Sequence, residues 1–258
     1  MSMLSHVFDS HSHYDSHQFD GTRYQLLDDM FSNGLAGIIH ASTDYESAIF
    51  GIETAKRYER FYTSIGFHPD SANSTSKSDL ERIFSLVKKD KVVAIGEIGL
   101  DYHYEGYERD KQIYLFKEQI KLALDNDLPV IVHSRDATLD CMEILNEYKP
   151  KGVVHCFSGS AETAKDVLSL GMYIGLTGVV TFKNNKKVHR VLEVLPPERY
   201  LLETDCPYMA PEPHRGKLCI SSMIEHTAER SAEIMGLDTA ELLKITEQNA
   251  KTLFNIKY

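Results

Sequence analysis

The chain of 258 residues is acidic, with 28 basic residues against 38 acidic residues and a formal net charge of −10. Its 42% hydrophobic and 26% charged residues are typical of globular proteins, which excludes an extensively disordered or fibrous chain. No apolar run approaches the roughly 18 residues that a membrane-spanning helix needs, so we expect no membrane association. A surface of this charge repels polyanions, so any nucleic-acid role requires a local binding site.

The cysteines and the first residues bear on the compartment. The four cysteines, Cys141, Cys156, Cys206 and Cys219, show no C-x-x-C spacing. The first residues lack the basic segment and apolar stretch of a secretory signal. We therefore expect neither a disulfide scaffold nor secretion, but a cytoplasmic protein. The chain shows no evident domain boundary, which predicts a single domain over residues 1–258.

Short runs rich in β-branched residues alternate along the chain with longer segments of helical periodicity. Strands are predicted at residues 6–10, 37–41, 61–65, 92–97, 129–133, 152–156, 172–176 and 200–205. Helices are predicted at residues 22–33, 45–57, 77–89, 108–126, 137–148, 161–170, 184–195 and 221–236, with one more at 239–254. This pattern predicts an α/β fold, a single (β/α)8 TIM barrel with an additional C-terminal helix. Periodicity alone also permits a doubly wound open sheet, and the polar residues favour the barrel.

Ionisable side chains follow the carboxyl ends of the predicted strands. These residues are His11, His13, His68, Glu97, His133, His155 and Asp205. In a barrel the carboxyl ends of all strands lie on one rim, where the active sites of such barrels are found. Residues almost 200 positions apart would then share one cavity.

The types and spacing of these residues indicate a metal site. His11 and His13 are two apart, so on an extended strand both imidazoles point to one face and can reach one ion. A lone H-x-H is more often a pair of surface histidines than a metal site, and a single strand-end histidine is more often structural than a ligand. Glu97, however, follows a wholly apolar run, where an unpaired buried carboxylate is expensive.

A cluster of four histidines and two carboxylates drawn from these residues suits one or two divalent ions, with imidazole favouring zinc, manganese or iron over calcium. Glu203 lies two residues before Asp205 and shares its face. It is either a further member of the site or a barrel-layer partner of a lysine or arginine, and we favour the latter.

Six motifs occur in order along the chain: FDSHSH at 8–13, GFHP at 66–69, GEIGLDY at 96–102, PVIVHSRDA at 129–137, HCFSG at 155–159 and ETDCPY at 203–208. In this set and order the sequence resembles the TatD family of metal-dependent hydrolases, within the amidohydrolase-like barrel superfamily. The resemblance implies one or two divalent metals, with His11, His13, Glu97, His133, His155 and Asp205 as ligands. It also implies that His68 and Arg135 line the substrate pocket. The implied activity is a magnesium-dependent deoxyribonuclease, commonly 3′ to 5′ on single-stranded ends, in a soluble cytoplasmic protein.

The loop PEPHRGK at 211–217 also matches the family. The chain then departs from it, because the family usually has an asparagine, often within R-N-x-P, where this chain has LCIS at 218–221. The departure bears on the loop conformation and on substrate preference, but not on the metal ligands. Arg135, Arg215 and Lys217 supply local positive charge for a phosphate. For Arg215 and Lys217 an ordinary solvated loop is the alternative.

Roles for other residues follow from the chemistry. Asp205 is assigned as a ligand and as the acceptor of the water's proton, and Glu97 would bridge two ions. Cys156 and Cys206 directly follow predicted ligands, so strand alternation makes them packing residues. Tyr102, Tyr104 and Tyr107 either stack on bases or cover the rim of the barrel, and we favour the second interpretation.

The leading hypothesis is a divalent-metal-dependent phosphodiester hydrolase acting on single-stranded DNA ends, with magnesium in function and zinc or manganese as alternatives. The second hypothesis is an ester or amide hydrolase of a small molecule, or an enzyme that removes D-amino acids from charged tRNA. The acidic net charge favours the second. A non-catalytic binding module has little use for a complete ligand set. No obligate protein partner is predicted.

Overall fold

The computed structural model describes residues 4–257. Within this range eight parallel strands pair in the order β1 to β8, which confirms the predicted barrel. The strands are β1 (Phe8–Ser12), β2 (Gly37–His40), β3 (Phe61–Ile65), β4 (Val92–Asp101), β5 (Val130–Arg135), β6 (Gly152–Val154), β7 (Tyr173–Leu176) and β8 (Tyr200–Leu202). The ring closes beyond β8, where the His13 amide donates to the Cys206 carbonyl (2.8 Å) and the Asp205 amide donates to the His11 carbonyl (3.0 Å).

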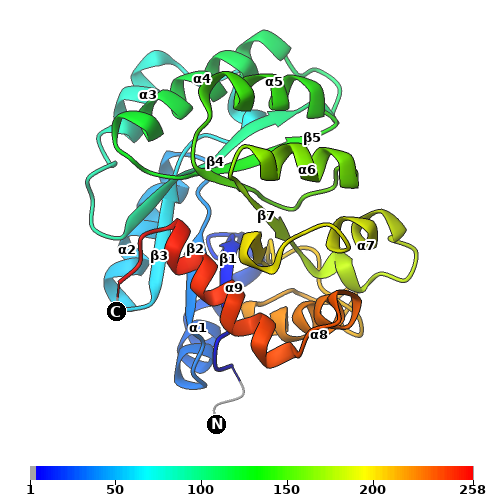
Figure 1. The fold of residues 1–258 in the computed structure, drawn as a ribbon. Helices are drawn as coiled ribbons and strands as arrows, with labels where there is room; N and C mark the ends of the chain where they lie inside the picture. Colours follow the sequence, from blue (N-terminus) through cyan, green and yellow to red (C-terminus); the bar gives the residue numbers. More distant parts are fainter. Residues whose placement is uncertain (1–3, 258) are drawn as a thin grey trace.

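Helices surround the sheet in the alternating order that the sequence predicts (Figure 1). They are α1 (Arg23–Ser32), α2 (Tyr45–Arg57), α3 (Lys77–Phe84), α4 (Arg109–Asp125), α5 (Thr138–Tyr148), α6 (Ala161–Ser169), α7 (Lys186–Leu192), α8 (Ile224–Met235) and α9 (Thr239–Leu253). Short 3₁₀ turns lie at His17–Phe19, Pro69–Ser71, Gly178–Thr181, Pro197–Arg199 and Ser221–Met223. Among residues 4–257, no helix combines the length and the apolar character required to cross a membrane.

The ends of the helices follow from local capping. Asp44 caps α2 by accepting a hydrogen bond from the Ser47 amide (2.8 Å), and Ser76 and Asp79 form a capping box at α3. Helix α3 stops five residues before the predicted end. The Leu86 amide bonds the carbonyl three residues earlier, and the Ser85 hydroxyl donates to a carbonyl of the last turn, so the chain leaves the helix in tight turns.

Helix α9 closes the end of the barrel opposite the strand carboxyl ends. A cluster of buried apolar side chains takes one residue from each strand and adds Leu253, Phe254 and Ile256 from the end of the chain. Because each of the eight strands contributes a side chain to it, this cluster lies inside the barrel. The Asn249 side chain also donates to the carbonyls of Pro197 (2.7 Å) and Tyr200 (2.9 Å), at the start of β8. Figure 1 shows α9 crossing in front of β1 and β2, so the additional C-terminal helix plugs this end.

Several strand ends differ from the prediction. β1 runs over Phe8–Ser12 rather than 6–10, so His11 lies within the strand, whereas β6 and β8 stop before His155 and Glu203. β4 continues to Asp101, and its register against β5 shifts between Ile95 and Ile98. Such an irregularity inserts a residue that apolar patterning does not reveal, and it turns a side chain toward a new direction.

Candidate metal centre

His11 and His13 bring their ring nitrogens together at the mouth of the barrel. The Nε2 atoms lie 3.0 Å apart. Oδ1 of Asp205 lies 3.2 Å from Nε2 of His13 and 3.7 Å from Nε2 of His11. Two ligands with metal–nitrogen distances of about 2.1 Å lie roughly 3 Å apart when they share one ion at about a right angle. The spacing of these three side chains therefore fits a shared cation.

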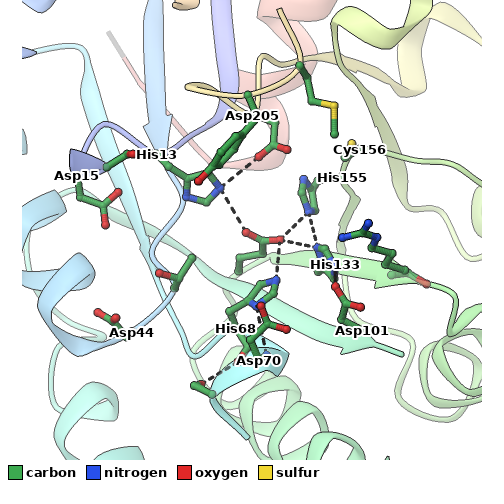
Figure 2. Close-up of a pocket in the computed structure, with 18 of the residues that line it drawn as sticks. His13, Asp15, Asp44, His68, Asp70, Asp101, His133, His155, Cys156 and Asp205 are labelled. Carbon is green, nitrogen blue, oxygen red and sulfur yellow. Dashed lines mark hydrogen bonds and ion pairs between the residues drawn. The ribbon is translucent and has the colours of Figure 1, made fainter. Parts of the chain in front are cut away.

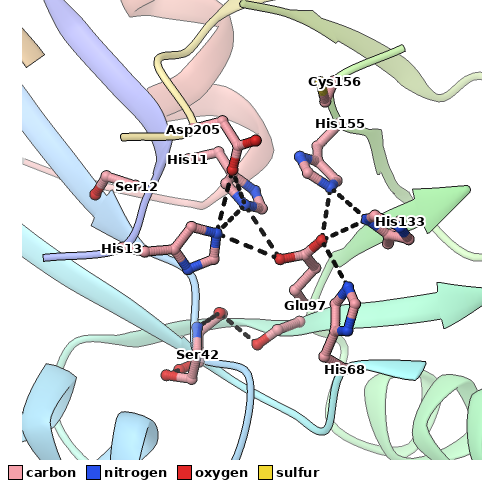
Figure 3. Close-up of polar contacts among 12 residues, drawn as sticks. His11, Ser12, His13, Ser42, His68, Glu97, His133, His155, Cys156 and Asp205 are labelled. Atoms are coloured by element: carbon pink, nitrogen blue, oxygen red, sulfur yellow. Dashed lines mark hydrogen bonds and ion pairs between the residues drawn. The ribbon is translucent and has the colours of Figure 1, made fainter. Parts of the chain in front are cut away.

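Glu97 lies between two groups of donors (Figure 3). Its Oε2 atom is 3.3 Å from Nε2 of His11 and 3.5 Å from Nε2 of His13. Its Oε1 atom is 2.7 Å from both Nδ1 of His133 and Nε2 of His155. One carboxylate thus faces one histidine pair with each oxygen, so each oxygen could serve a different ion.

Neighbouring strands hold Glu97 in this position. Its amide donates to the Ser42 carbonyl (2.7 Å), just after β2, and the Ser64 hydroxyl donates to the carbonyl of Gly96 (2.5 Å). These bonds fall at the register shift of β4, where the ladder with β5 is interrupted. The backbone that carries Glu97 is therefore fixed from β2 and β3, and its side chain points into the ring of histidines.

The predicted ligands converge on one site. The donor atoms form three sets, and within each set the atoms lie within 4.8 Å of one another. The sets are His11, His13 and Asp205; His11, Glu97 and His155; and His68, Glu97 and His133. His68, predicted as a pocket residue, thus lies beside the predicted ligands, with Nε2 3.6 Å from Oε1 of Glu97.

Burial and charge set the protonation of this cluster. Burial lowers the pKa of His11 to about 3, with the charge of His155 as a second cause. Burial also opposes the charged form of His13, but the hydrogen bond to Asp205 and the charges of Glu97 and Asp205 raise its pKa to about 9. The pKa of His133 rises to about 10, since bonds to Asp101 and Glu97 outweigh burial. The surrounding histidines hold the pKa of Glu97 well below its usual range in spite of burial.

The residues present fit a divalent metal. The donors are imidazole nitrogens and carboxylate oxygens, a set that suits first-row transition metals as well as smaller hard cations. Ionised Glu97 and Asp205 would compensate the ion's charge, and His11 is neutral at physiological pH. Among the described residues, Nδ1 of His11 and Nδ1 of His155 are buried without a hydrogen-bond partner, although the latter lies 3.8 Å from Oε1 of Glu203.

A cavity of about 950 Å³ opens over the cluster. Its lining includes His68 and Arg135, the two residues expected at the substrate, together with the rim aromatics Tyr104 and Tyr208. One wall is acidic, because Asp15, Asp44 and Asp70 lie on the loops after β1, β2 and β3 (Figure 2).

Arg215 and Lys217 lie away from this lining. The Arg215 guanidinium stands over the Phe182 ring at 4.4 Å, and Lys217 is exposed to solvent. The cavity lining contains neither residue. Their assignment to substrate binding stays a prediction.

Asp101 is a site residue to which sequence reasoning assigned no role. Its Oδ2 atom lies 3.1 Å from Nε2 of His133, and it lines the cavity. Burial opposes ionisation of Asp101, but the bond to His133 lowers its pKa. The signal was available, since Asp101 is four residues after Glu97, and even spacing on a strand places both on one face.

Glu203 does not pair with a lysine or arginine, contrary to expectation. Within residues 4–257 its ion-pair contact is Nδ1 of His155, 3.8 Å from Oε1, and the Cys156 amide donates to the same oxygen (2.5 Å). Gly175 makes room for it, since a Cβ there would lie 2.3 Å from Oε2 of Glu203. Burial raises the pKa of Glu203 well above its usual range. Glu203 therefore belongs to the layer behind His155.

The expectation that Cys156 turns away from the site is wrong. Cys156 lines the cavity, because β6 ends at Val154 and Cys156 has a φ of 42°, so strand alternation does not apply. Cys206 is fully buried, as expected for a packing residue.

A parallel eight-stranded barrel with a histidine and carboxylate cluster at its mouth defines the class of the barrel metal-dependent hydrolases. The family model described as TatD related DNase matches residues 8–255. The "Uncharacterized metal-dependent hydrolase YabD" of Bacillus subtilis (strain 168) is 38% identical over 97% of this chain and 99% of its own length. The "3'-5' ssDNA/RNA exonuclease TatD" of Cronobacter sakazakii is 32% identical over 96% of this chain and 97% of its own.

Solved structures agree with this assignment. The crystal structure of YJJV, a TatD homolog from Escherichia coli K12, superposes with a TM-score of 0.92 at 31% identity, covering 98% of this chain and all of that chain (100%). A hydrolase TatD family protein from Entamoeba histolytica superposes with a TM-score of 0.85 at 26% identity, covering 98% and 99% of the two chains. The chain belongs to the TatD family of metal-dependent hydrolases.

Proposed function

We propose that this metal-dependent hydrolase cleaves phosphodiester bonds at the ends of single-stranded DNA, in the 3′ to 5′ direction. The position of Glu97 between two donor groups carries the proposal, because paired ions suit displacement at phosphorus. The name of the Cronobacter relative, an ssDNA/RNA exonuclease, supports the same substrate class.

We assign the ligands as His11, His13, Glu97, His133, His155 and Asp205, with Glu97 common to both ion positions. Bound there, a divalent ion would neutralise phosphate charge and acidify a water molecule. Magnesium is our choice for the functional ion, and the four imidazoles also suit zinc or manganese.

The chain's own residues supply positioning and proton transfer. Hydrogen bonding to His13 lowers the pKa of Asp205 in spite of burial, so its carboxylate is ionised at neutral pH and can accept a proton. Arg135, on the cavity wall, would give a phosphate oxygen charge-assisted hydrogen bonds. His68 lies against Oε1 of Glu97 and would hold the substrate beside the bridging carboxylate.

The acidic wall supports action at strand ends. Asp15, Asp44 and Asp70 line the cavity on the side of β1 to β3, where a continuing phosphate backbone would meet like charge. A strand end needs only a few phosphates on the opposite side, beside Arg135. We also infer a cytoplasmic location, which the four free cysteines support.

The acidic wall also favours one second candidate, a deacylase of D-aminoacyl-tRNA or another ester or amide hydrolase. The free ammonium of an aminoacyl group would pair with Asp15, Asp44 or Asp70. The same ligands and the same water would serve this reaction.

Incubation of metal-stripped protein with end-labelled single-stranded DNA, with magnesium, manganese and zinc titrated separately, tests the proposal. We expect stepwise shortening from the 3′ end with at least one ion, and the same DNA carrying a blocked 3′ end should resist. An affinity that falls linearly on a log–log plot against salt indicates phosphate contacts, whereas an aminoacyl ester of a small alcohol should respond little. Hydrolysis of the ester without shortening of DNA would replace the first candidate by the second.

A further inference from the structure

Large exposed apolar side chains gather at the mouth of the cavity. Tyr104 is 60% exposed, Tyr208 53% and Met209 39%, and all three line the cavity above the donor cluster. Exposed aromatic rings that border a polar site are candidates for ligand contacts rather than for packing. The other lining residues are carboxylates, imidazoles, hydroxyl side chains, Arg135 and Cys156, so these three side chains are the large apolar part of the lining.

The two tyrosines come from opposite sides of the barrel. Tyr104 lies on the loop after β4, and Tyr208 lies on the loop after β8. In a ring of eight strands paired in sequence order, these positions are four strands apart, across the mouth. Tyr208 stands on the same turn as Asp205, because its amide donates to the Asp205 carbonyl (3.0 Å).

The loop that carries Tyr104 is braced on both flanks. The Tyr102 and Tyr107 rings stack on each other, with centroids 4.6 Å apart and planes 12° apart. Tyr104 lies between them in the sequence, and it is the one of the three that lines the cavity. The Tyr102 hydroxyl donates to Asp140 (2.7 Å), and the Asn73 side chain donates to the Gly106 carbonyl (3.2 Å). The ring is therefore presented on a fixed loop.

Arg135 connects this ring to the catalytic cluster. Its Nη1 atom donates to the Tyr104 hydroxyl (3.3 Å), and its guanidinium carbon lies 5.1 Å from the Tyr104 ring centroid. Arg135 follows His133 by two residues on β5. Arg135 thus contacts the exposed Tyr104 ring and stands two residues from a donor of the cluster, so a base stacked on that ring and a phosphate at the cluster would both lie near one cation.

We infer that Tyr104 and Tyr208 form two stacking positions for unpaired nucleobases, one on each side of the phosphate held at the donor cluster. The inference rests on the proposed function and specifies its substrate, a DNA end whose last nucleotides carry their bases and are not paired in a duplex. Stacking is available to every base, since each has a π face, so the two rings select unpaired ends without selecting sequence. A base-paired end keeps its bases in the duplex stack and cannot offer both faces.

Binding of a tetradeoxynucleotide tests the inference separately from cleavage. The probe carries a 5′ fluorophore and phosphorothioate links that slow hydrolysis, and its anisotropy is followed with magnesium present. We expect Tyr104→Ala and Tyr208→Ala each to raise Kd about 5- to 100-fold, the range that one lost stack gives. Tyr104→Phe and Tyr208→Phe should stay within about twofold, because they keep the ring. Tyr114→Ala is the matched control, a 54% exposed tyrosine on α4 outside the cavity lining.

A second probe, with its last two nucleotides abasic, should bind the unchanged protein weakly and show no response to either alanine substitution. Equal affinity for the two probes, no binding of the complete probe, or unchanged Kd in both alanine variants overturns the inference. Cleavage is scored in parallel with unmodified DNA. If binding depends on the two rings but no added ion supports cleavage, the proposed nuclease activity is rejected and the stacking positions stand. If DNA is cleaved but the alanine substitutions change neither binding nor cleavage, the nuclease activity stands and the stacking positions are rejected.

Discussion

The imidazole rings of His11 and His155 stack face to face, with centroids 3.8 Å apart and planes 5° apart. Two protonated rings at this distance would repel each other, and burial lowers the pKa of His11 to about 3. His11 is therefore ready to ligate an ion without losing a proton. His13, 3.0 Å away, is not, since its pKa is about 9.

This contrast predicts that metal loading releases protons. At pH 7 an ion must displace the protons of His13 and of His133, whose pKa is about 10. The metal Kd should therefore fall as pH rises from 6.5 toward 9, by about tenfold per pH unit for each proton released. Calorimetry at pH 7 in two buffers of different ionisation enthalpy counts the protons. Identical heats in both buffers would contradict the prediction.

Asp205→Asn should keep the fold and lose about 10²- to 10⁴-fold in kcat, because the amide cannot accept the water's proton. The backbone tolerates the change, since Asp205 has a φ of 58° and asparagine readily adopts this left-handed conformation. Asp136→Asn is the matched control, with a φ of 53° and a position outside the cavity lining. Near-normal turnover in Asp205→Asn at saturating metal would refute the assigned role.

The sequence predicts the barrel and the convergence of the donors, because strand polarity alone brings the residues after each strand to one rim. It does not predict how Glu97 turns toward two groups of donors. That orientation depends on the register shift of β4 and on the hydrogen bond from the Glu97 amide to the Ser42 carbonyl. This hydrogen bond joins segments that are far apart in the chain. The prediction that Cys156 turns away from the site fails for a similar reason. Its positive φ, just beyond the three-residue strand β6, means that side chains no longer alternate between the two faces there.

His11→Ala combined with His13→Ala should lower the metal content by about one ion per chain, because one donor group is removed. Elemental analysis after dialysis measures the loss. His214→Ala with His226→Ala is the control, a second pair with Nε2 atoms 3.1 Å apart but outside the cavity lining. Equal metal content in both double variants would count against an ion at the β1 pair.

Asp101→Asn should weaken metal binding about 10- to 100-fold, because its carboxylate orients His133 and keeps that ring a strong donor. High metal concentration should restore most of kcat, which separates positioning from catalysis. Asp44→Asn serves as the control, because Asp44 also lines the cavity and the side-chain oxygen of an asparagine there can still cap α2. A kcat loss that metal does not rescue would give Asp101 a direct part in the reaction.

The atypical segment at 218–221 is held by a buried network. The Ser221 hydroxyl donates to Oδ2 of Asp9 (2.6 Å) and lies 2.7 Å from the hydroxyl of Tyr14, while the Thr204 hydroxyl donates to the same Asp9 oxygen (2.6 Å). Burial raises the pKa of Asp9 to about 6 although these donors lower it. The network anchors the segment to β1 without the asparagine usual in the family.

Ser221→Ala should therefore destabilise the protein in a pH-dependent way. Folded Asp9 keeps its proton up to about pH 6, above the usual 3.8, so its ionisation costs stability as pH rises through that window. Loss of the Ser221 hydroxyl donor makes it more costly to bury the ionised Asp9 carboxylate. We therefore expect the free energy of unfolding to fall by about 1–3 kcal/mol at pH 7.5 but by less at pH 4.5. Urea unfolding of metal-free protein at both pH values measures the difference. Ser231→Ala removes a buried hydroxyl 2.8 Å from the hydroxyl of Tyr200, with no carboxylate bonded to it, and should cost the same at both. A pH-independent loss for Ser221→Ala would show that Asp9 is not the group stabilised.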